Sequence, residues 1–163
     1  MYILKKSIFN NLTSLLIVLF GISLIAISFG VYTQATKYTL QDYDQKLVAD
    51  RNGVVEKVDV ITNLLGSEKE KAQIETKIGE LEALITSFEQ KLEQEEVPKN
   101  GEPLKQENKQ FANLAKKVAQ TSKEYLALFE DDQLDVNATI SKYNASVDAL
   151  NTQITKIDEE VKN

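Results

Sequence analysis

The sequence EVPKNGEP, residues 96–103, holds both prolines of the chain and an Asn-Gly pair. Proline lacks the amide hydrogen that a helix interior needs, and Asn-Gly favours a turn. Long stretches with helical periodicity lie on both sides of this segment. We therefore predict a hairpin loop at 96–103 that joins two antiparallel helices.

Apolar residues recur at spacings of three and four on each side of the loop, which indicates amphipathic helices. The stripe before the loop is Ile74, Ile78, Leu81, Ile85, Phe88 and Leu92. The stripe after it is Leu104, Phe111, Leu114, Val118, Tyr125 and Leu128, with Glu107 and Thr121 as polar interruptions. The hairpin lets these two stripes bury each other.

Two further stripes lie outside this pair. The first is Val54, Val58, Ile61 and Leu65, and the last is Val136, Ile140, Tyr143, Val147, Leu150, Ile154, Ile157 and Val161. Each is out of register with its neighbour. The first slip coincides with Gly66-Ser67, a helix-ending glycine followed by an N-cap serine, with Glu70 at the capping-box position. The second lies near Asp131, among aspartates that favour a helix start.

We therefore expect an all-α fold with helical segments at 37–65, 68–95, 104–129 and 133–161. Breaks at Gly66 and Asp131 give an antiparallel helical bundle. If both positions are only bends, the same sequence makes a long coiled-coil hairpin of two helices.

An apolar stretch precedes these helices. Residues 12–32 read LTSLLIVLFGISLIAISFGVY, and no charged residue occurs between Lys6 and Lys37. At about 1.5 Å per residue this stretch spans roughly 30 Å, the thickness of a bilayer core. We predict a single transmembrane helix at 12–32. A cleaved signal peptide is the alternative, but its apolar region would usually be shorter.

The charges predict how the chain lies in the membrane. Lys5 and Lys6 precede the apolar stretch, so residues 1–11 form a short cytoplasmic N-terminus under the positive-inside rule. Residues 37–163 then form an extracytoplasmic helical domain on a single-pass protein of the plasma (inner) membrane. All 25 acidic residues lie in this domain, and its surface is expected to be acidic.

The composition excludes most catalytic chemistry. The chain has no His and no Cys, which removes the usual bases, thiolate nucleophiles and metal ligands. We predict a protein that is not an enzyme, with no catalytic, cofactor-binding or metal-binding residues. The acidic runs at 93–96 and 158–160 are interpreted as solvated helix surfaces, and Tyr143 as a core residue.

Nucleic acid is not an expected partner. The formal net charge is −6, and Arg51 is the only arginine beside 18 lysines. Nucleic-acid binding needs a basic face, and base recognition favours the planar guanidinium of arginine.

The segment YNASVDALNTQI, residues 143–154, resembles a helix of the LemA family of membrane proteins, with the pattern Y-N-x-x-V-x-x-x-N-x-x-I. The resemblance implies an N-terminal anchor and an extended helical domain. The prolines typical of that family after this helix and in the first exported helix are absent here. The order of anchor and helical domain is also similar to the sensor half of a chemoreceptor and to a phage inner-membrane spanin.

These observations favour a non-enzymatic, single-pass protein of a bacterial cell envelope. It would act as a scaffold, tether or complex subunit, with coiled-coil contacts to a protein partner or to itself through the helical seams. No small-molecule substrate is evident. The alternatives are a ligand-binding or sensory helical-bundle module that signals to a membrane partner, and a LemA-like membrane protein.

Overall fold

The computed structural model describes residues 38–66, 71–129 and 134–162. These residues form four helices: α2 (Leu40–Leu65), α3 (Lys71–Gln94), α4 (Glu102–Ala127) and α5 (Val136–Lys162). The prediction of an all-α domain is confirmed for this part of the chain. Each helix corresponds to one of the four predicted segments, with ends that differ by a few residues.

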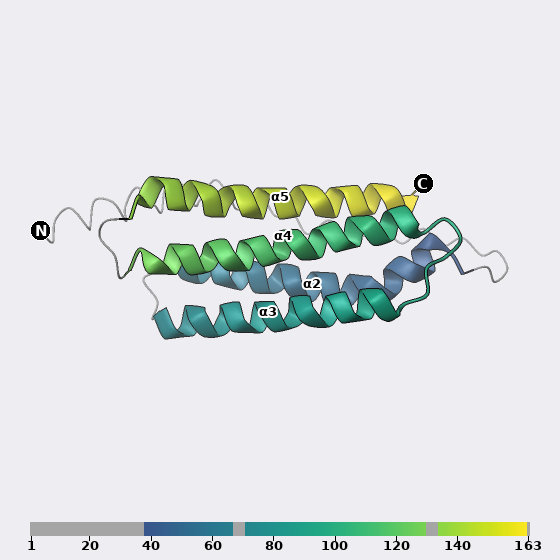
Figure 1. Ribbon diagram of the computed structural model, residues 1–163, viewed down its shortest axis with the longest axis horizontal. Coiled ribbons are helices and arrows are strands. Elements are labelled where there is room, and N and C mark those ends of the chain that lie inside the picture. Colours follow the sequence, from purple (N-terminus) through teal and green to yellow (C-terminus); the bar gives the residue numbers. More distant parts are fainter. Residues whose placement is uncertain (1–37, 67–70, 130–133, 163) are drawn as a thin grey trace, which may run out of the picture. The chain divides into compact units, whose positions relative to one another are not determined.

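The four helices form a bundle and not a hairpin of two long helices. The central helices α2 and α4 each contact the three others, whereas α3 and α5 do not contact each other. Figure 1 shows α3 and α5 on the two outer sides, with α4 and α2 between them. Successive helices run antiparallel, as their short connections require.

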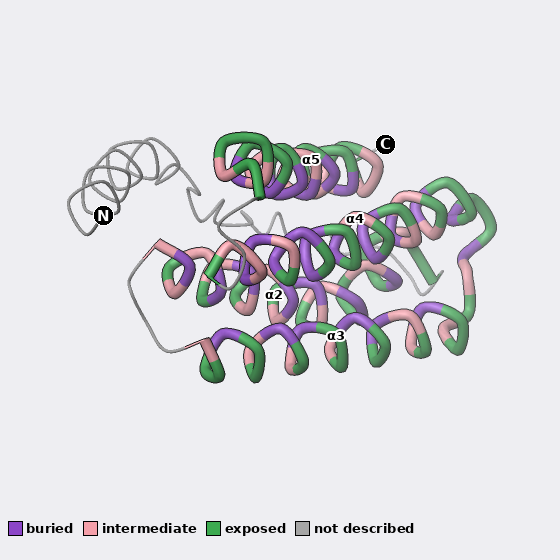
Figure 2. The backbone as a smooth tube through the Cα atoms, turned by 60° about the vertical axis from the view of Figure 1, so that its left-hand side comes forward, coloured by how far each residue is buried: buried purple, intermediate pink, exposed green. Residues whose placement is uncertain are grey.

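The predicted stripes make the core of this bundle. Every stripe residue of α2 and α3 is buried, and Figure 2 shows the buried residues along the inward sides of the helices. On α4 and α5, most stripe residues are buried, while Leu114, Leu128, Val136, Ile154 and Val161 remain partly exposed. The apolar periodicity therefore identified the core, and the stripe residues that are not fully buried lie mainly on α5.

Helix α4 has a second buried face that its apolar stripe did not predict. This face contains small and polar residues, namely Asn108, Ala112, Ala115, Ala119 and Ser122. Small side chains let two helix backbones approach closely, and Asn108 on this face accepts a hydrogen bond from Arg51 of α2 at 2.9 Å. A central helix needs two such faces because it is covered from both sides.

The hairpin loop is shorter than predicted. Helix α4 begins at Glu102, so Pro103 lies in its first turn and not in the loop. A proline is tolerated there because first-turn amides have no partner inside the helix. Gly101 closes the loop by donating its N–H to the Pro98 carbonyl at 2.8 Å. A Cβ atom at position 101 would lie 2.7 Å from the Pro98 ring, so a larger residue does not fit without a shift.

The two predicted breaks separate helices. Helix α2 ends at Leu65, and the Gly66 N–H donates to the Thr62 carbonyl at 3.1 Å. Ser67 and Glu70, the predicted capping box, lie outside the described residues, as does Asp131. Asp135 caps α5, since its carboxylate accepts a hydrogen bond from the Ala138 N–H at 3.0 Å.

The Asp135 cap gives a first prediction. Asp135→Ala removes the acceptor of an otherwise unpaired helix amide and should lower the free energy of unfolding by about 1 kcal/mol. Asp148→Ala is the matched control, because Asp148 is exposed on the same helix and its side chain caps no amide. Urea unfolding of the full chain measures both changes, and equal values for the two variants would contradict the capping role.

The predicted membrane helix at 12–32 lies outside the described residues. Among the helices at 40–65, 71–94, 102–127 and 136–162, none combines the length and the apolar character needed to cross a bilayer.

Candidate functional site

The first cluster of polar side chains inside the bundle surrounds Arg51. This residue comes from α2 and is only 4% exposed. Its Nη1 donates to Asn108 Oδ1 of α4 at 2.9 Å, and its Nη2 lies 2.6 Å from Asp44 Oδ1, two turns away on α2. Asn108 in turn donates from Nδ2 to the Leu104 carbonyl at 2.8 Å. The only arginine of the chain thus joins α2 to α4.

Asp158 adds a second carboxylate to this cluster from α5. Burial raises the pKa of Asp158, and the negative charge of Asp44 raises it further, while the Arg51 guanidinium opposes both effects. Two carboxylates therefore face one guanidinium. The cluster brings together α2, α4 and α5, and the charge of Lys162 on α5 also lowers the pKa of Asp158.

Nearby, Gln153 of α5 holds the backbone of α4. Gln153 is buried, and its Nε2 donates to the Glu107 carbonyl at 2.9 Å and to Glu107 Oε2 at 2.5 Å. An amide nitrogen with both hydrogens bonded fixes the position of one helix along the other. Glu107, which interrupts the apolar stripe of α4, is therefore part of an interhelical contact.

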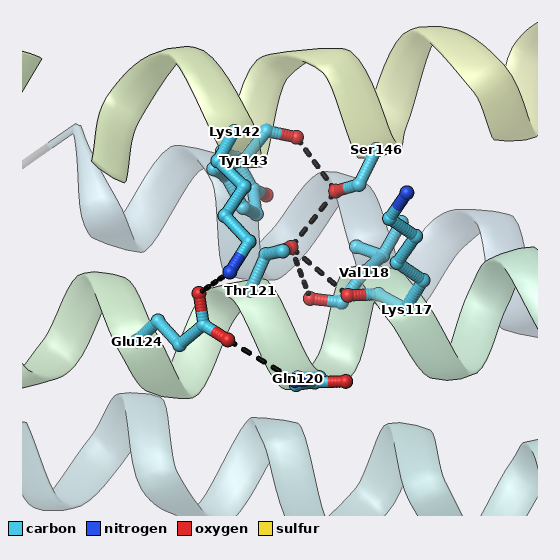
Figure 3. Close-up of polar contacts among 8 residues, drawn as sticks. All are labelled: Lys117, Val118, Gln120, Thr121, Glu124, Lys142, Tyr143 and Ser146. Carbon is cyan, nitrogen blue, oxygen red and sulfur yellow. Dashed lines mark hydrogen bonds and ion pairs between the residues drawn. The ribbon is translucent and has the colours of Figure 1, made fainter. Parts of the chain in front are cut away.

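A second cluster consists of hydroxyl groups between α4 and α5 (Figure 3). The hydroxyls of Thr121 and Ser146 lie 2.8 Å apart, and both are buried. Ser146 donates to the Tyr143 carbonyl at 2.6 Å, while Thr121 lies within hydrogen-bond distance of the Lys117 and Val118 carbonyls. Ser146 thus bonds to its own helix, and the single Thr121 proton is donated either to Ser146 of α5 or to a carbonyl of α4. At the edge of this cluster, Lys142 and Glu124 form an ion pair at 2.5 Å.

Tyr143 extends this cluster to α2. Its hydroxyl lies 2.6 Å from the Thr62 hydroxyl, and its ring packs edge-on against Tyr125 with centroids 5.9 Å apart. Burial raises the pKa of Tyr143 to about 12, although hydrogen bonds from Thr62 and Ser122 lower it. The phenol therefore stays protonated at neutral pH. The prediction that Tyr143 belongs to the core is confirmed.

A groove lies between α3 and α4 on the outside of the bundle. It has a volume of about 450 Å³, and Ile78, Gly79, Leu126 and Ala127 line its apolar part. Charged side chains border it, including Lys123 and Glu82, which form an ion pair at 2.5 Å. Among the residues that the structure describes, no three acidic side chains are grouped closely enough to hold a metal ion.

The interior polar residues were not predicted as a group. The sole arginine was read only as evidence against nucleic-acid binding, and Asp158 as part of a solvated run; the structure places both in the Arg51 cluster. One sequence signal was present: Leu47, Arg51 and Val54 are spaced by four and three, so Arg51 occupies a stripe position.

The chain matches no protein-family model, no curated protein and no solved structure. The resemblance of residues 143–154 to LemA proteins therefore stays a prediction.

The charge of Asp158 gives a second prediction. Because its pKa is raised in the folded state, the ionised carboxylate opposes folding above that pKa, and stability is gained as the pH falls through it. Asp158→Asn should therefore raise the melting temperature at pH 7 by about 2 to 4 °C. The difference between variant and native protein should shrink between pH 7 and pH 4.

Glu159→Gln is the control for this prediction. Glu159 is the next residue on α5 and is exposed, so its loss should leave the melting temperature nearly unchanged at both pH values. Melting curves of the full chain at pH 4 and pH 7 provide the measurement. A lower melting temperature for Asp158→Asn at pH 7 would show that attraction to Arg51 outweighs the cost of burial.

Proposed function

We propose that this chain is a non-enzymatic, single-pass envelope protein whose helical bundle acts as a scaffold or tether for a protein partner. The observation that carries the proposal is that the interior polar groups form hydrogen bonds within the bundle. Arg51, Asn108, Gln153, Thr121 and Ser146 bond to one another or to neighbouring helix backbones. Such groups hold helices in register and supply no activated nucleophile or base.

The anchor and its orientation belong to the same proposal. The uncharged stretch at 12–32 is long enough to span a bilayer, and Lys5 and Lys6 favour a cytoplasmic N-terminus. The bundle then lies outside the plasma membrane. Its helical seams pack against each other within one chain, so a partner would bind a surface that this packing leaves accessible.

Chemical crosslinking in intact cells tests the proposal. The expected result is a crosslinked product between this chain and a second, different protein. Recovery of the chain alone, or of products containing only this chain, would remove the basis for a tethering role.

Protease treatment of spheroplasts tests the orientation. The bundle should be digested from outside while the N-terminus is protected. Protection of the bundle in intact spheroplasts, with digestion only after lysis, would place it in the cytoplasm.

A ligand-binding sensory bundle is the second candidate, and the groove between α3 and α4 favours it. Its apolar lining of Ile78, Gly79, Leu126 and Ala127 suits a small apolar ligand. Stabilisation of the full chain against heat by a small molecule would support this function. Loss of that stabilisation on Gly79→Leu would locate the ligand in the groove.

A further inference from the structure

One side of the bundle is incompletely closed. We name it the α2/α5 edge and define it by six residues that are all partly exposed: Val48, Val55 and Asp59 on α2, and Ile154, Asp158 and Val161 on α5. Helices α2 and α5 form the least extensive of the interhelical contacts. By contrast, the six stripe residues of α3 are no more than 1% exposed.

Contacts at the two ends of the α2/α5 edge show which helix faces these residues occupy. Val55 lies one heptad before Thr62, whose hydroxyl contacts Tyr143 of α5, and Val48 lies one heptad before Val55. Residues seven apart share a helix face, so both valines point to the α5 side of α2. On α5, Ile154 lies one turn before Asp158, which interacts with Arg51 of α2.

The charges at this edge differ from those at the other seams. The α2/α3 seam is bordered by ion pairs of Lys46 with Glu95, Lys57 with Glu80, and Lys91 with Asp50. The α3/α4 seam is bordered by ion pairs of Glu93 with Lys105 and Lys109, Glu89 with Lys116, and Glu82 with Lys123. Across the described residues, no ion pair joins α2 to α5.

In the described residues, neither carboxylate of the edge forms a salt bridge with a lysine, although the charge of Lys162, one turn after Asp158 on α5, lowers the pKa of Asp158. Asp59 lies beside Tyr143 at one end, and Asp158 beside Arg51 and Asp44 at the other. Burial raises the pKa of Asp59, and the nearby charge of Glu56 raises it further. A cation supplied from outside would relieve this repulsion at Asp59 and at Asp158.

We propose that the α2/α5 edge binds an amphipathic helix of a protein partner, one with an apolar stripe bordered by lysine or arginine. The apolar stripe would cover Val48, Val55, Ile154 and Val161, and the basic residues would pair with Asp59 and Asp158. Arg51, which faces Asp158, lies eight residues before Asp59. On α5, Asp158 lies 15 residues after Tyr143, which is beside Asp59. The two basic residues of the partner should therefore be about 12 to 22 Å apart, roughly two to four helical turns.

Charge also argues against two other occupants. A second copy of this chain would bring the same carboxylates against each other. A membrane surface with anionic lipids would be repelled in the same way. An amphipathic basic helix would bury the apolar residues and pair with the carboxylates, so it fits the edge better than either of these occupants.

This inference rests on the proposed function and deepens it. The test uses the full chain in lipid nanodiscs and a fluorescent 21-residue helical peptide with a leucine stripe bordered by lysines. A second peptide has the same stripe with glutamates in place of the lysines. Fluorescence anisotropy measures the dissociation constant of each peptide.

Two double variants with equal net charge give the comparison. Asp59→Asn with Asp158→Asn neutralises the edge, whereas Glu96→Gln with Glu159→Gln removes two exposed carboxylates that form no ion pair and do not belong to the edge. The lysine peptide should bind the edge variant about tenfold more weakly than the native chain, and the control variant like the native chain. Circular dichroism confirms that both variants are folded.

Three outcomes would overturn the inference. The lysine peptide does not bind the native chain, it binds both double variants equally, or the glutamate peptide binds as tightly as the lysine peptide. If cellular crosslinking still recovers a partner protein while the peptide test fails, this inference falls and the proposed function stands. If crosslinking recovers no partner, the proposed function itself falls.

Discussion

Arg51→Met is expected to lower the free energy of unfolding by about 3 to 5 kcal/mol, because it leaves buried groups without their cation. Asp44 loses its ion pair, Asn108 loses the donor to its Oδ1, and Asp158 loses the larger of the two cationic effects that oppose its burial. Methionine has a similar length and is apolar, so the loss of packing is small. Urea unfolding of the full chain measures the effect.

Lys57→Met is the matched control on the same helix. Lys57 forms an ion pair with Glu80 in which both side chains are partly exposed, so its loss should cost less than about 1 kcal/mol. A triple variant, Arg51→Met with Asp44→Leu and Asn108→Leu, removes the buried pair together with its partners. It should recover much of the lost stability. If Arg51→Met costs no more than Lys57→Met, the cluster does not hold the bundle together.

Phe88→Ala is expected to lower the free energy of unfolding by about 3 to 5 kcal/mol, because it leaves a cavity in the packed core. Phe88 of α3 and Phe111 of α4 are both fully buried, and their rings pack edge-on with centroids 5.6 Å apart. This contact closes the hairpin that the two prolines predicted. Phe129→Ala serves as the control, since Phe129 is 42% exposed and its loss should cost much less.

A double-mutant cycle separates the ring contact from the burial of each ring. The coupling between Phe88→Ala and Phe111→Ala should be about 0.5 to 1.5 kcal/mol. Strictly additive costs would show that the two rings are buried independently. The hairpin would then depend on the rest of the stripe.

The helices could be predicted because each depends on local residues. Apolar spacing identified the buried faces of α2 and α3, and the register slip at Gly66 showed where α2 ends. The start of α4 was placed two residues late because both prolines were assigned to the loop, although Pro103 is compatible with a first turn. The exact first and last residues of a helix depend on a few hydrogen bonds at its ends. The spacing of apolar residues does not reveal these bonds.

The candidate sites could not be predicted because they depend on which helices become neighbours. Thr121 looked like an interruption of the α4 stripe, yet it faces Ser146 once α5 packs on that side. Likewise, the α2/α5 edge exists only because α3 and α5 occupy opposite sides of the α2/α4 pair. The apolar spacing along one helix shows which face is buried, but it does not show which neighbouring helix covers each residue of that face.

The most direct test of a partner at the α2/α5 edge is site-specific photo-crosslinking in intact cells. A photo-crosslinking amino acid replaces Val55 at the edge or, as the control, Gln90 on the exposed side of α3. Position 55 should crosslink a protein other than this chain, and Asp59→Asn with Asp158→Asn should weaken that product. Position 90 should give little crosslinked product. Crosslinking from position 90 alone, or from position 55 only to another copy of this chain, would contradict the account.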